Sequence, residues 1–240
     1  MRWLSPVPRA ADALELLDGP ASFPDRRRSL LDVARLNGLF GGRRVTLAQV
    51  KRLLARLPAD RTVTILDLGT GAGDIPVALV RWARRVRRPV RVYALDRDAA
   101  TLRVARDLVG PHPEIVLVQA DAMALPLRPG AVDVVISALT LHHLEPAAAT
   151  RCLAVMDEAA RVGIVVNDLS RSRAAWALVW LATRFLARSP LSRHDGPLSV
   201  LRAYTAEELR ALGARAGLGR VEIRRYPPLL RHCLVKAKAP

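Results

Sequence analysis

The chain has 240 residues, 51% of them hydrophobic, a length that suits one well-buried α/β domain with an appended segment rather than two full domains. Its two cysteines, Cys152 and Cys233, lie far apart and form no C-x-x-C pair, which argues against a disulfide framework or a zinc site and is typical of a cytoplasmic protein. The formal net charge of +16 comes mostly from arginines scattered over many segments, so we expect a basic surface rather than a nucleic-acid partner.

Two helices are predicted ahead of the core. Leucines within residues 14–17 would form the apolar face of the first helix, and Asp25 would cap the second. No apolar run of signal-peptide length is present before the first acidic residues, so we expect no secretion signal. We assign residues 1–44 to an N-terminal helical cap with Asn37 as a candidate substrate contact, although packing on the core alone would also explain the second helix.

A further helix is predicted to pack beside the first strand of the sheet. Thr46 and Gln49 have the spacing of a capping box, which predicts a helix start at Thr46. Pro58 would end this helix because proline cannot continue it. The next stretch, TVTILDLGTGAGDIP at residues 62–76, predicts an apolar buried strand, a glycine-rich turn and a helix.

The glycine-rich turn predicts a nucleotide-cofactor site. Gly69, Gly71 and Gly73 would let the backbone turn tightly and approach a ligand closely, and the following helix directs its free N–H groups at the turn. A carboxylate at Asp67 would repel a pyrophosphate but suits a ligand that carries an ammonium group. The dinucleotide fingerprint requires glycine or alanine where this chain has Asp74, which argues against a dinucleotide.

Further acids follow the next two predicted strands. Asp96 ends the run VRVYALD, where a carboxylate can bind both hydroxyls of a ribose. Asp121 follows EIVLVQA, where its carboxylate could accept a hydrogen bond from an adenine amino group. A fourth strand, VDVVISAL, comes next, and strands that alternate with helices predict a doubly wound, mostly parallel sheet.

These segments resemble the motifs of class I S-adenosylmethionine-dependent methyltransferases: ILDLGTGAG the first, LDRD the second, ADAMALPL the third and DVVISALTLHHL the fourth. The resemblance implies an α/β fold with a seven-stranded sheet of order 3-2-1-4-5-7-6, helices on both faces and a domain over residues 45–240. The implied cofactor is S-adenosyl-L-methionine. The implied cofactor-binding residues are Asp67, Gly69, Thr70, Gly71, Gly73, Asp96, Arg97, Asp121, Ala122, Ser137 and Ala138.

Two histidines, His142 and His143, follow the fourth strand at the edge of the sheet where ligands bind. We predict that one of them is the catalytic base, with His143 as the first candidate, because the pKa of histidine lies near neutrality. The alternative is that the pair only hydrogen-bonds the backbone and shapes the pocket. Metal-dependent relatives have acids near the fourth motif, where this chain has ALTLHH, so we predict no metal ligand.

The region after the fifth predicted strand, GIVVND, is expected to form a helix and a lid. The run AAWALVWLATRFLA is apolar on almost every side but too short to span a bilayer, so it would pack on the core, a partner subunit or an apolar substrate. The run ARSPLSRHDGPLSV is rich in turn residues and is expected to be a loop. We assign residues 171–204 to this insertion, with Asn167, Arg193 and His194 as candidate substrate anchors.

The end of the chain predicts a capped helix and a hairpin. Thr205 and Glu208 have the spacing of a capping box. The final segment, VEIRRYPPLLRHCLVKAKAP, contains two runs separated by a pair of prolines, which fits the antiparallel hairpin of a methyltransferase sheet.

The nearest resemblance is to small-molecule methyltransferases named for ubiquinone and menaquinone biosynthesis. We therefore predict O-methylation of a small, moderately apolar phenol or quinol that enters between the N-terminal helices and residues 174–194. An RNA methyltransferase, a non-catalytic cofactor-binding protein and a homodimer that buries the apolar helix stay as alternatives. The fourth motif lacks the Asn/Asp-Pro-Pro-aromatic pattern of RNA amine methylation, and no tyrosine is followed four residues later by the lysine of a nicotinamide dehydrogenase.

Overall fold

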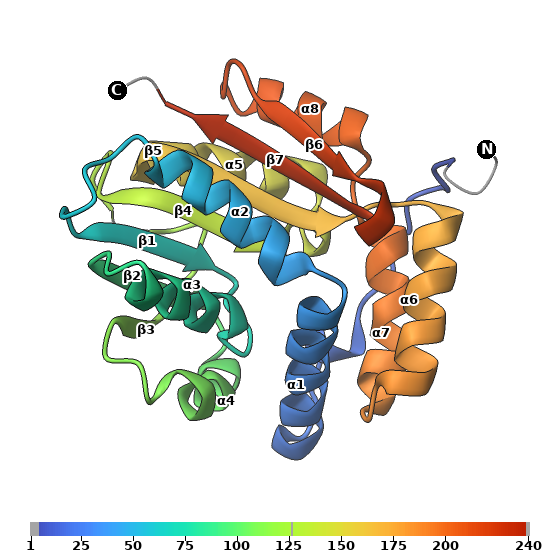
Figure 1. Ribbon diagram of the computed structural model, residues 1–240. Coiled ribbons are helices and arrows are strands. Elements are labelled where there is room, and N and C mark those ends of the chain that lie inside the picture. Colours follow the sequence, from blue (N-terminus) through green and yellow to red (C-terminus); the bar gives the residue numbers. More distant parts are fainter. Residues whose placement is uncertain (1–4, 126, 239–240) are drawn as a thin grey trace.

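A computed structural model describes residues 5–125 and 127–238 of the chain (Figure 1). One seven-stranded sheet has the order β3-β2-β1-β4-β5-β7-β6, which confirms the predicted topology. Strands β1 to β5 pair in parallel, and β7 runs antiparallel to both of its neighbours. The strands are β1 Val63–Leu68, β2 Val90–Asp96, β3 Ile115–Gln119, β4 Val132–Ala138, β5 Ala160–Leu169, β6 Glu222–Tyr226 and β7 Arg231–Ala237.

Helices cover both faces of this sheet, as predicted. They are α1 Phe23–Leu39, α2 Gly42–Leu54, α3 Asp74–Arg85, α4 Ala99–Val109, α5 Pro146–Ala159, α6 Arg173–Leu186, α7 Pro190–Arg202 and α8 Ala206–Arg215. One apolar core lies between the sheet and α2, α3 and α4, and the other lies between the sheet and α5 and α8. Helices α1, α6 and α7 instead gather beyond the carboxyl ends of the parallel strands, where they form a cap (Figure 1).

The first predicted helix is wrong. Only a three-residue 3-10 helix forms there, at Leu16–Asp18. The backbone N–H groups of Leu16 and Leu17 donate to the carboxylate of Asp195 at 2.8 and 2.9 Å, so a long-range partner satisfies them in place of a local helix. The second helix does form as α1, but its cap is Ser22, whose hydroxyl accepts from the Asp25 backbone N–H.

Helix α2 begins at Gly42, one turn before the predicted start at Thr46. Gly41 precedes it with a φ of 75°, which favours glycine. The Thr46 hydroxyl therefore lies inside the helix and donates to the Gly42 carbonyl, while Gln49 donates to the hydroxyl of Tyr226. The helix start predicted from the capping-box spacing is therefore wrong, because Gly41 forms the turn that starts the helix.

The segment predicted as a loop at residues 187–200 is largely helix α7. Ser189 precedes Pro190, and proline at the first helical position is a favourable start because its missing N–H has no helical partner in any case. Asp32 of α1 accepts hydrogen bonds from the backbone of Arg188 and Ser189, which fixes the entry to the helix. A side chain at Gly196 would lie 2.6 Å from Thr183, so glycine allows α7 to pack closely on α6.

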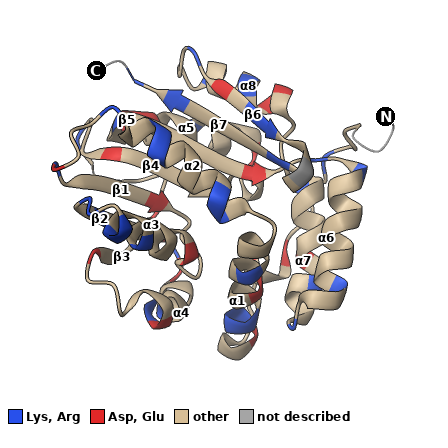
Figure 2. Cartoon of the chain, in the orientation of Figure 1, with Lys and Arg blue, Asp and Glu red and all other residues tan. Residues whose placement is uncertain are grey.

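The capping box of α8 and the C-terminal hairpin are confirmed. The Thr205 side chain accepts from the Glu208 backbone, and the Glu208 carboxylate accepts from the Thr205 backbone. Lys and Arg lie on elements throughout the fold, including α1, α2, α3 and β7 (Figure 2). Within the part of the chain that the structure describes, no helix is long and apolar enough to cross a membrane.

Candidate active site

The glycine turn after β1 exposes its backbone to open space. Gly69 and Gly71 have φ angles of 70° and 56°, in the left-handed region. A Cβ at Gly69 would lie 2.5 Å from the Thr140 hydroxyl, whereas one at Gly71 would meet only Leu30, at 3.8 Å. Gly71 therefore lets a ligand approach the backbone where a side chain would intrude.

A cavity of about 900 Å³ lies over this turn, between the carboxyl ends of the strands and the cap. Most of the predicted cofactor residues line it: Asp67, Gly69, Thr70, Gly71, Asp96, Arg97, Asp121, Ala122 and Ala138. Gly73 and Ser137 do not. Gly73 packs against Val109 of α4, and the buried Ser137 hydroxyl donates to the Leu68 carbonyl at 3.1 Å, so both residues shape the turn from behind.

Three carboxylates are held at the strand ends. Asp96 accepts from the backbone N–H groups of Gly71 and Asp98 at 3.2 and 3.1 Å, and burial raises its pKa. Asp121 is exposed, and its carboxylate accepts from the backbone N–H of Met123 at 2.8 Å. These bonds orient the side chains of Asp96 and Asp121 in the cavity wall.

Asp67 is the most deeply buried of the three acids. Its carboxylate accepts a hydrogen bond from the Thr70 hydroxyl at 2.7 Å. Burial raises the pKa of Asp67 to about 7, against the lowering effect of that hydrogen bond. A positively charged ligand group beside Asp67 would favour its ionised form.

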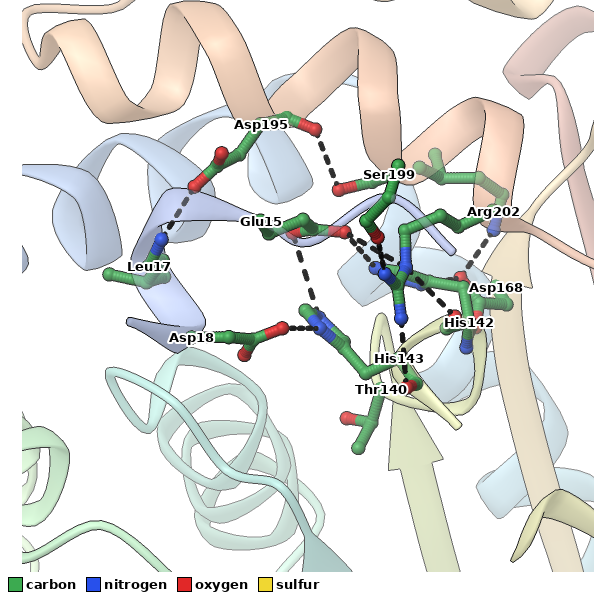
Figure 3. A network of polar contacts seen from close by, with 12 residues as sticks. Glu15, Leu17, Asp18, Thr140, His142, His143, Asp168, Asp195, Ser199 and Arg202 are labelled. Carbon is green, nitrogen blue, oxygen red and sulfur yellow. Dashed lines mark hydrogen bonds and ion pairs between the residues drawn. The ribbon is translucent and has the colours of Figure 1, made fainter. Parts of the chain in front are cut away.

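The two histidines lie on a 3-10 turn, Leu141–His143, directly after β4. The Nδ1 atom of His142 lies 2.7 Å from Asp168, and that of His143 lies 2.9 Å from Asp18. Both Nε2 atoms face the carboxylate of Glu15, at 3.6 and 3.8 Å, and Figure 3 shows the two rings on one side of it. Both histidines line the cavity, as predicted.

Charge on this cluster is set by burial and by the imidazoles. Burial pushes the pKa of Asp168 upward, but the charge and hydrogen bond of His142 hold it below its usual value. The pKa of Asp18 is lowered in the same way by His143 despite partial burial. Glu15 differs, because burial dominates and raises its pKa to about 7.

Arginines fasten the N-terminal segment over the histidine turn. Arg202 of α7 donates to the carbonyls of His143 and Ala13, and Arg9 donates to the carbonyl of Leu144 at 3.0 Å. Cation–π contact with Tyr204 also holds Arg9 in place. These contacts position the acids of residues 15–18 in the cavity.

The part of the cavity under the cap is lined mainly by apolar side chains. They come from α1 and α6 and include Leu30, Val33, Leu178, Val179 and Ala182. Asn37 also lines the cavity, as predicted, and its amide donates to Asp74 at 3.1 Å. The predicted entry region between α1 and residues 174–194 therefore borders the cavity.

Three predicted substrate anchors lie elsewhere, so the geometry gives that prediction no support. The buried Asn167 amide donates to Gly42 and Thr46 and fastens the start of α2. Arg193 donates to the carbonyl of Ala187, and His194 pairs with Asp195. Because residues 190–202 are helical, Arg193 and His194 do not sit at the tip of a lid, and they are not among the cavity-lining residues.

Sequence reasoning missed Glu15, Asp18 and Arg231, all of which line the cavity. Nothing in the local sequence of Glu15 and Asp18 marks them, since both reach the site through long-range contacts. Arg231 opens β7 and is buried, and burial lowers its pKa to about 10. Its Nε and Nη1 atoms have no hydrogen-bond partner among the described residues.

Comparison with known proteins agrees with the fold. Residues 65–163 match the family model of a methyltransferase domain. A putative S-adenosyl-L-methionine-dependent methyltransferase of Methanococcus maripaludis superposes with a TM-score of 0.61 at 12% identity, covering 92% of this chain and 96% of that one. This likeness establishes the fold.

Two curated relatives share parts of the sequence. The malonyl-[acyl-carrier protein] O-methyltransferase of Geobacter sulfurreducens is 31% identical over 183 residues, 72% of this chain and 63% of that protein. The 2-phytyl-1,4-naphtoquinone methyltransferase of Thermosynechococcus vestitus is 42% identical over 73 residues, 30% of this chain and 31% of that protein. The chain thus spans less than two thirds of the length of both relatives.

Proposed function

We propose that this chain, which carries a class I S-adenosylmethionine-dependent methyltransferase domain, transfers the methyl group of S-adenosyl-L-methionine to a small, moderately apolar acceptor. The single observation that carries the proposal is one continuous cavity with two chemically different ends. A glycine turn and the strand-end acids line one end, and apolar side chains line the other together with two imidazoles and the acids Glu15 and Asp18 that face them.

The strand-end residues fit the cofactor. Gly71 leaves room for a ligand against the backbone, Asp96 offers a carboxylate for the ribose hydroxyls, and Asp121 offers an acceptor for the adenine amino group. Asp67 suits a ligand with positive charge, because such a charge would offset the cost of ionising a buried carboxylate. When bound, the cofactor supplies an electrophilic methyl group on a sulfonium.

The acceptor end suits a phenol or quinol. Ligand sites for such molecules are mostly apolar with a few polar groups, and α1 and α6 supply that apolar wall. The naphthoquinone methyltransferase among the relatives supports a ring-shaped acceptor. The malonyl-carrier relative supports an oxygen as the methylated atom.

His143 or His142 would take the proton from the acceptor hydroxyl. An ionised carboxylate only accepts hydrogen bonds, so Asp18 and Asp168 favour the hydrogen of each ring on Nδ1, and a neutral ring of this kind has a lone pair on Nε2 that can take a proton. His143 is the better placed of the two, because its side chain is 25% exposed against 3% for His142. The chain also positions the acceptor, and positioning is a large part of such catalysis.

A labelled-methyl screen tests this proposal. The full chain is incubated with S-adenosylmethionine that carries a labelled methyl group and with separate pools of phenols, quinols, lipids and RNA. We expect label in the phenol or quinol pool. Label in RNA alone, or cofactor binding with no transfer to any pool, would contradict the proposal.

A further inference from the structure

The convergence of Glu15, His142 and His143 goes beyond methyl transfer. We propose that these three residues bind one divalent transition-metal ion, such as Zn²⁺, beside the cofactor. This departs from the sequence prediction of no metal ligand, because the acid comes from the N-terminal segment and not from the fourth motif. The proposal concerns binding of the ion itself, so it would still hold if the chain proved not to transfer methyl groups.

The distances between the three residues suit an ion. One ligand atom from each residue can be chosen so that all lie within 4.8 Å of one another. The Nε2 atoms of His142 and His143 lie 3.6 and 3.8 Å from the Glu15 oxygens, too long for hydrogen bonds. Ligands at zinc-bond lengths around a tetrahedral ion are about 3.4 Å apart, so a small inward movement would complete the site.

The orientation of both histidines suits metal binding. The Nδ1 atoms of His142 and His143 lie at hydrogen-bond distance from Asp168 and Asp18, and both Nε2 atoms face Glu15 (Figure 3). A neutral ring that donates from Nδ1 has its lone pair on Nε2, the atom that would bind the ion. A metal-binding histidine usually donates its other ring N–H to a carboxylate or carbonyl in this way. Here both imidazoles have a carboxylate at Nδ1 and the same Glu15 carboxylate at Nε2, which is the pattern expected of two ligands of one ion.

Glu15 provides a second, independent sign of a missing partner. Its side chain is 5% exposed, and Oε1 has no hydrogen-bond partner among the described residues. A buried polar atom without a partner is costly, and a metal ion bound to Oε1 would remove that cost. The nearest positive side chain is that of Arg202, whose Nε lies 3.9 Å from Glu15 Oε1 and whose guanidinium donates to backbone carbonyls.

The ligand types suit a cation. Glu15, Asp18 and Asp168 place three carboxyl groups on the cluster, while the guanidinium groups of Arg202 and Arg9 donate to backbone carbonyls. Imidazole and carboxylate together are typical ligands of zinc and of other divalent transition metals. With three protein ligands, a fourth position stays open, as in catalytic zinc sites.

The open position gives the ion a chemical role that does rest on the proposed function. His143 lines the cavity, so an acceptor oxygen could reach the ion. A bound cation stabilises an oxyanion, which lowers the pKa of a bound hydroxyl. With the ion bound, both Nε2 lone pairs would be occupied and the acceptor hydroxyl would lose its proton to water, so an imidazole acts as the base only in the metal-free protein.

Calorimetry on the full chain tests the site. Protein freed of metal with a chelator is titrated with Zn²⁺ in the absence of cofactor and acceptor, and Co²⁺ is added in parallel because its absorption spectrum reports coordination. We expect one ion per chain. Glu15→Gln and His143→Gln should each abolish this binding, and Asp18→Asn should weaken it by roughly tenfold or more, the range for a carboxylate that supports a metal-binding histidine.

His194→Gln is the matched control, since His194 also pairs with an aspartate but lies outside the cavity. It should bind Zn²⁺ as the wild type does. Asp18→Asn keeps the test decisive if Glu15→Gln fails to fold, because Asp18 is a partly exposed side chain. Absence of Zn²⁺ binding, or binding that is the same in His143→Gln and Asp18→Asn as in wild type, would overturn the proposal; so would a loss as large in His194→Gln.

Discussion

The two ends of the cavity are built in different ways. At the cofactor end, Asp67, Gly69 and Gly71 come from one short stretch, and Asp96 and Asp121 come from the ends of neighbouring strands. At the end that we assign to the acceptor, residues 15–18, α1, α6, α7 and the histidine turn are brought together by contacts across the chain. The cofactor end therefore depends on local backbone geometry, and the acceptor end depends on tertiary packing.

The largest expected effect falls on the acceptor end. Replacing His143 by Gln should lower turnover by roughly 100-fold or more while cofactor affinity stays near wild type, because general-base catalysis contributes on this scale. His142→Gln is the paired variant and should have the smaller effect, since its ring is buried. Initial rates with labelled cofactor and calorimetry with S-adenosylhomocysteine measure the two quantities. Wild-type turnover over the whole pH range in both variants would place the base elsewhere.

Substitutions at the cofactor end should lower the affinity for the cofactor. Asp96→Ala should cost about 1–3 kcal/mol of S-adenosylhomocysteine binding, the cost of leaving polar partners unsatisfied. It should also free the Gly71 N–H from its hydrogen bond with Asp96. Asp107→Ala, an exposed acid on α4 that pairs with Arg27, is the control and should bind normally. Equal affinities of the two variants in calorimetry would contradict the predicted role of Asp96.

Burial of Asp67 predicts a pH dependence of stability. Its pKa is about 7 in the fold against 3.8 for the free side chain, so between about pH 4 and 7 the folded protein holds a proton that the unfolded chain has lost. The free energy of unfolding of the ligand-free protein should therefore fall as pH rises through this window. Asp67→Asn should remove that contribution. Urea unfolding of both proteins at several pH values checks this, and parallel curves would show that Asp67 is not the group responsible.

The smallest effect is expected on the outer face of the cap. Phe185 is 74% exposed near the end of α6 and is not among the cavity-lining residues. Phe185→Ser should change stability by no more than about 0.5 kcal/mol, as is usual for exposed positions, and should leave transfer intact. Light scattering decides the alternative, because a dimer in wild type that the substitution dissociates would assign this face to a subunit interface.

The sequence predicted the backbone of the cofactor end well because its determinants are local. An apolar strand, glycines with left-handed φ angles and an acid at the strand end all follow one another, and the order of the strands follows from the resemblance. Gly73 and Ser137 show the limit of this reasoning, since a motif residue can support the turn without facing the cavity.

The cap was predicted less well, for a physical reason. The backbone N–H groups of Leu16 and Leu17 donate to Asp195, and α7 is held by Asp32 of α1 as well as by its own sequence. Local periodicity carries no information on such partners. For the same reason the sequence did not predict Glu15 as a site residue, because its neighbours His142 and His143 are distant in the chain.

The central claim is that cofactor and acceptor occupy two ends of one cavity, and Val179→Trp tests it most directly. Val179 lies on α6 and lines the cavity, so the larger side chain would fill the end that we assign to the acceptor. Transfer of labelled methyl to the phenol or quinol pool is measured together with the affinity for S-adenosylhomocysteine. We predict that transfer is lost while the affinity stays near that of the wild type. Transfer at the wild-type rate, or loss of cofactor binding together with transfer in a protein that is still folded, would contradict the claim.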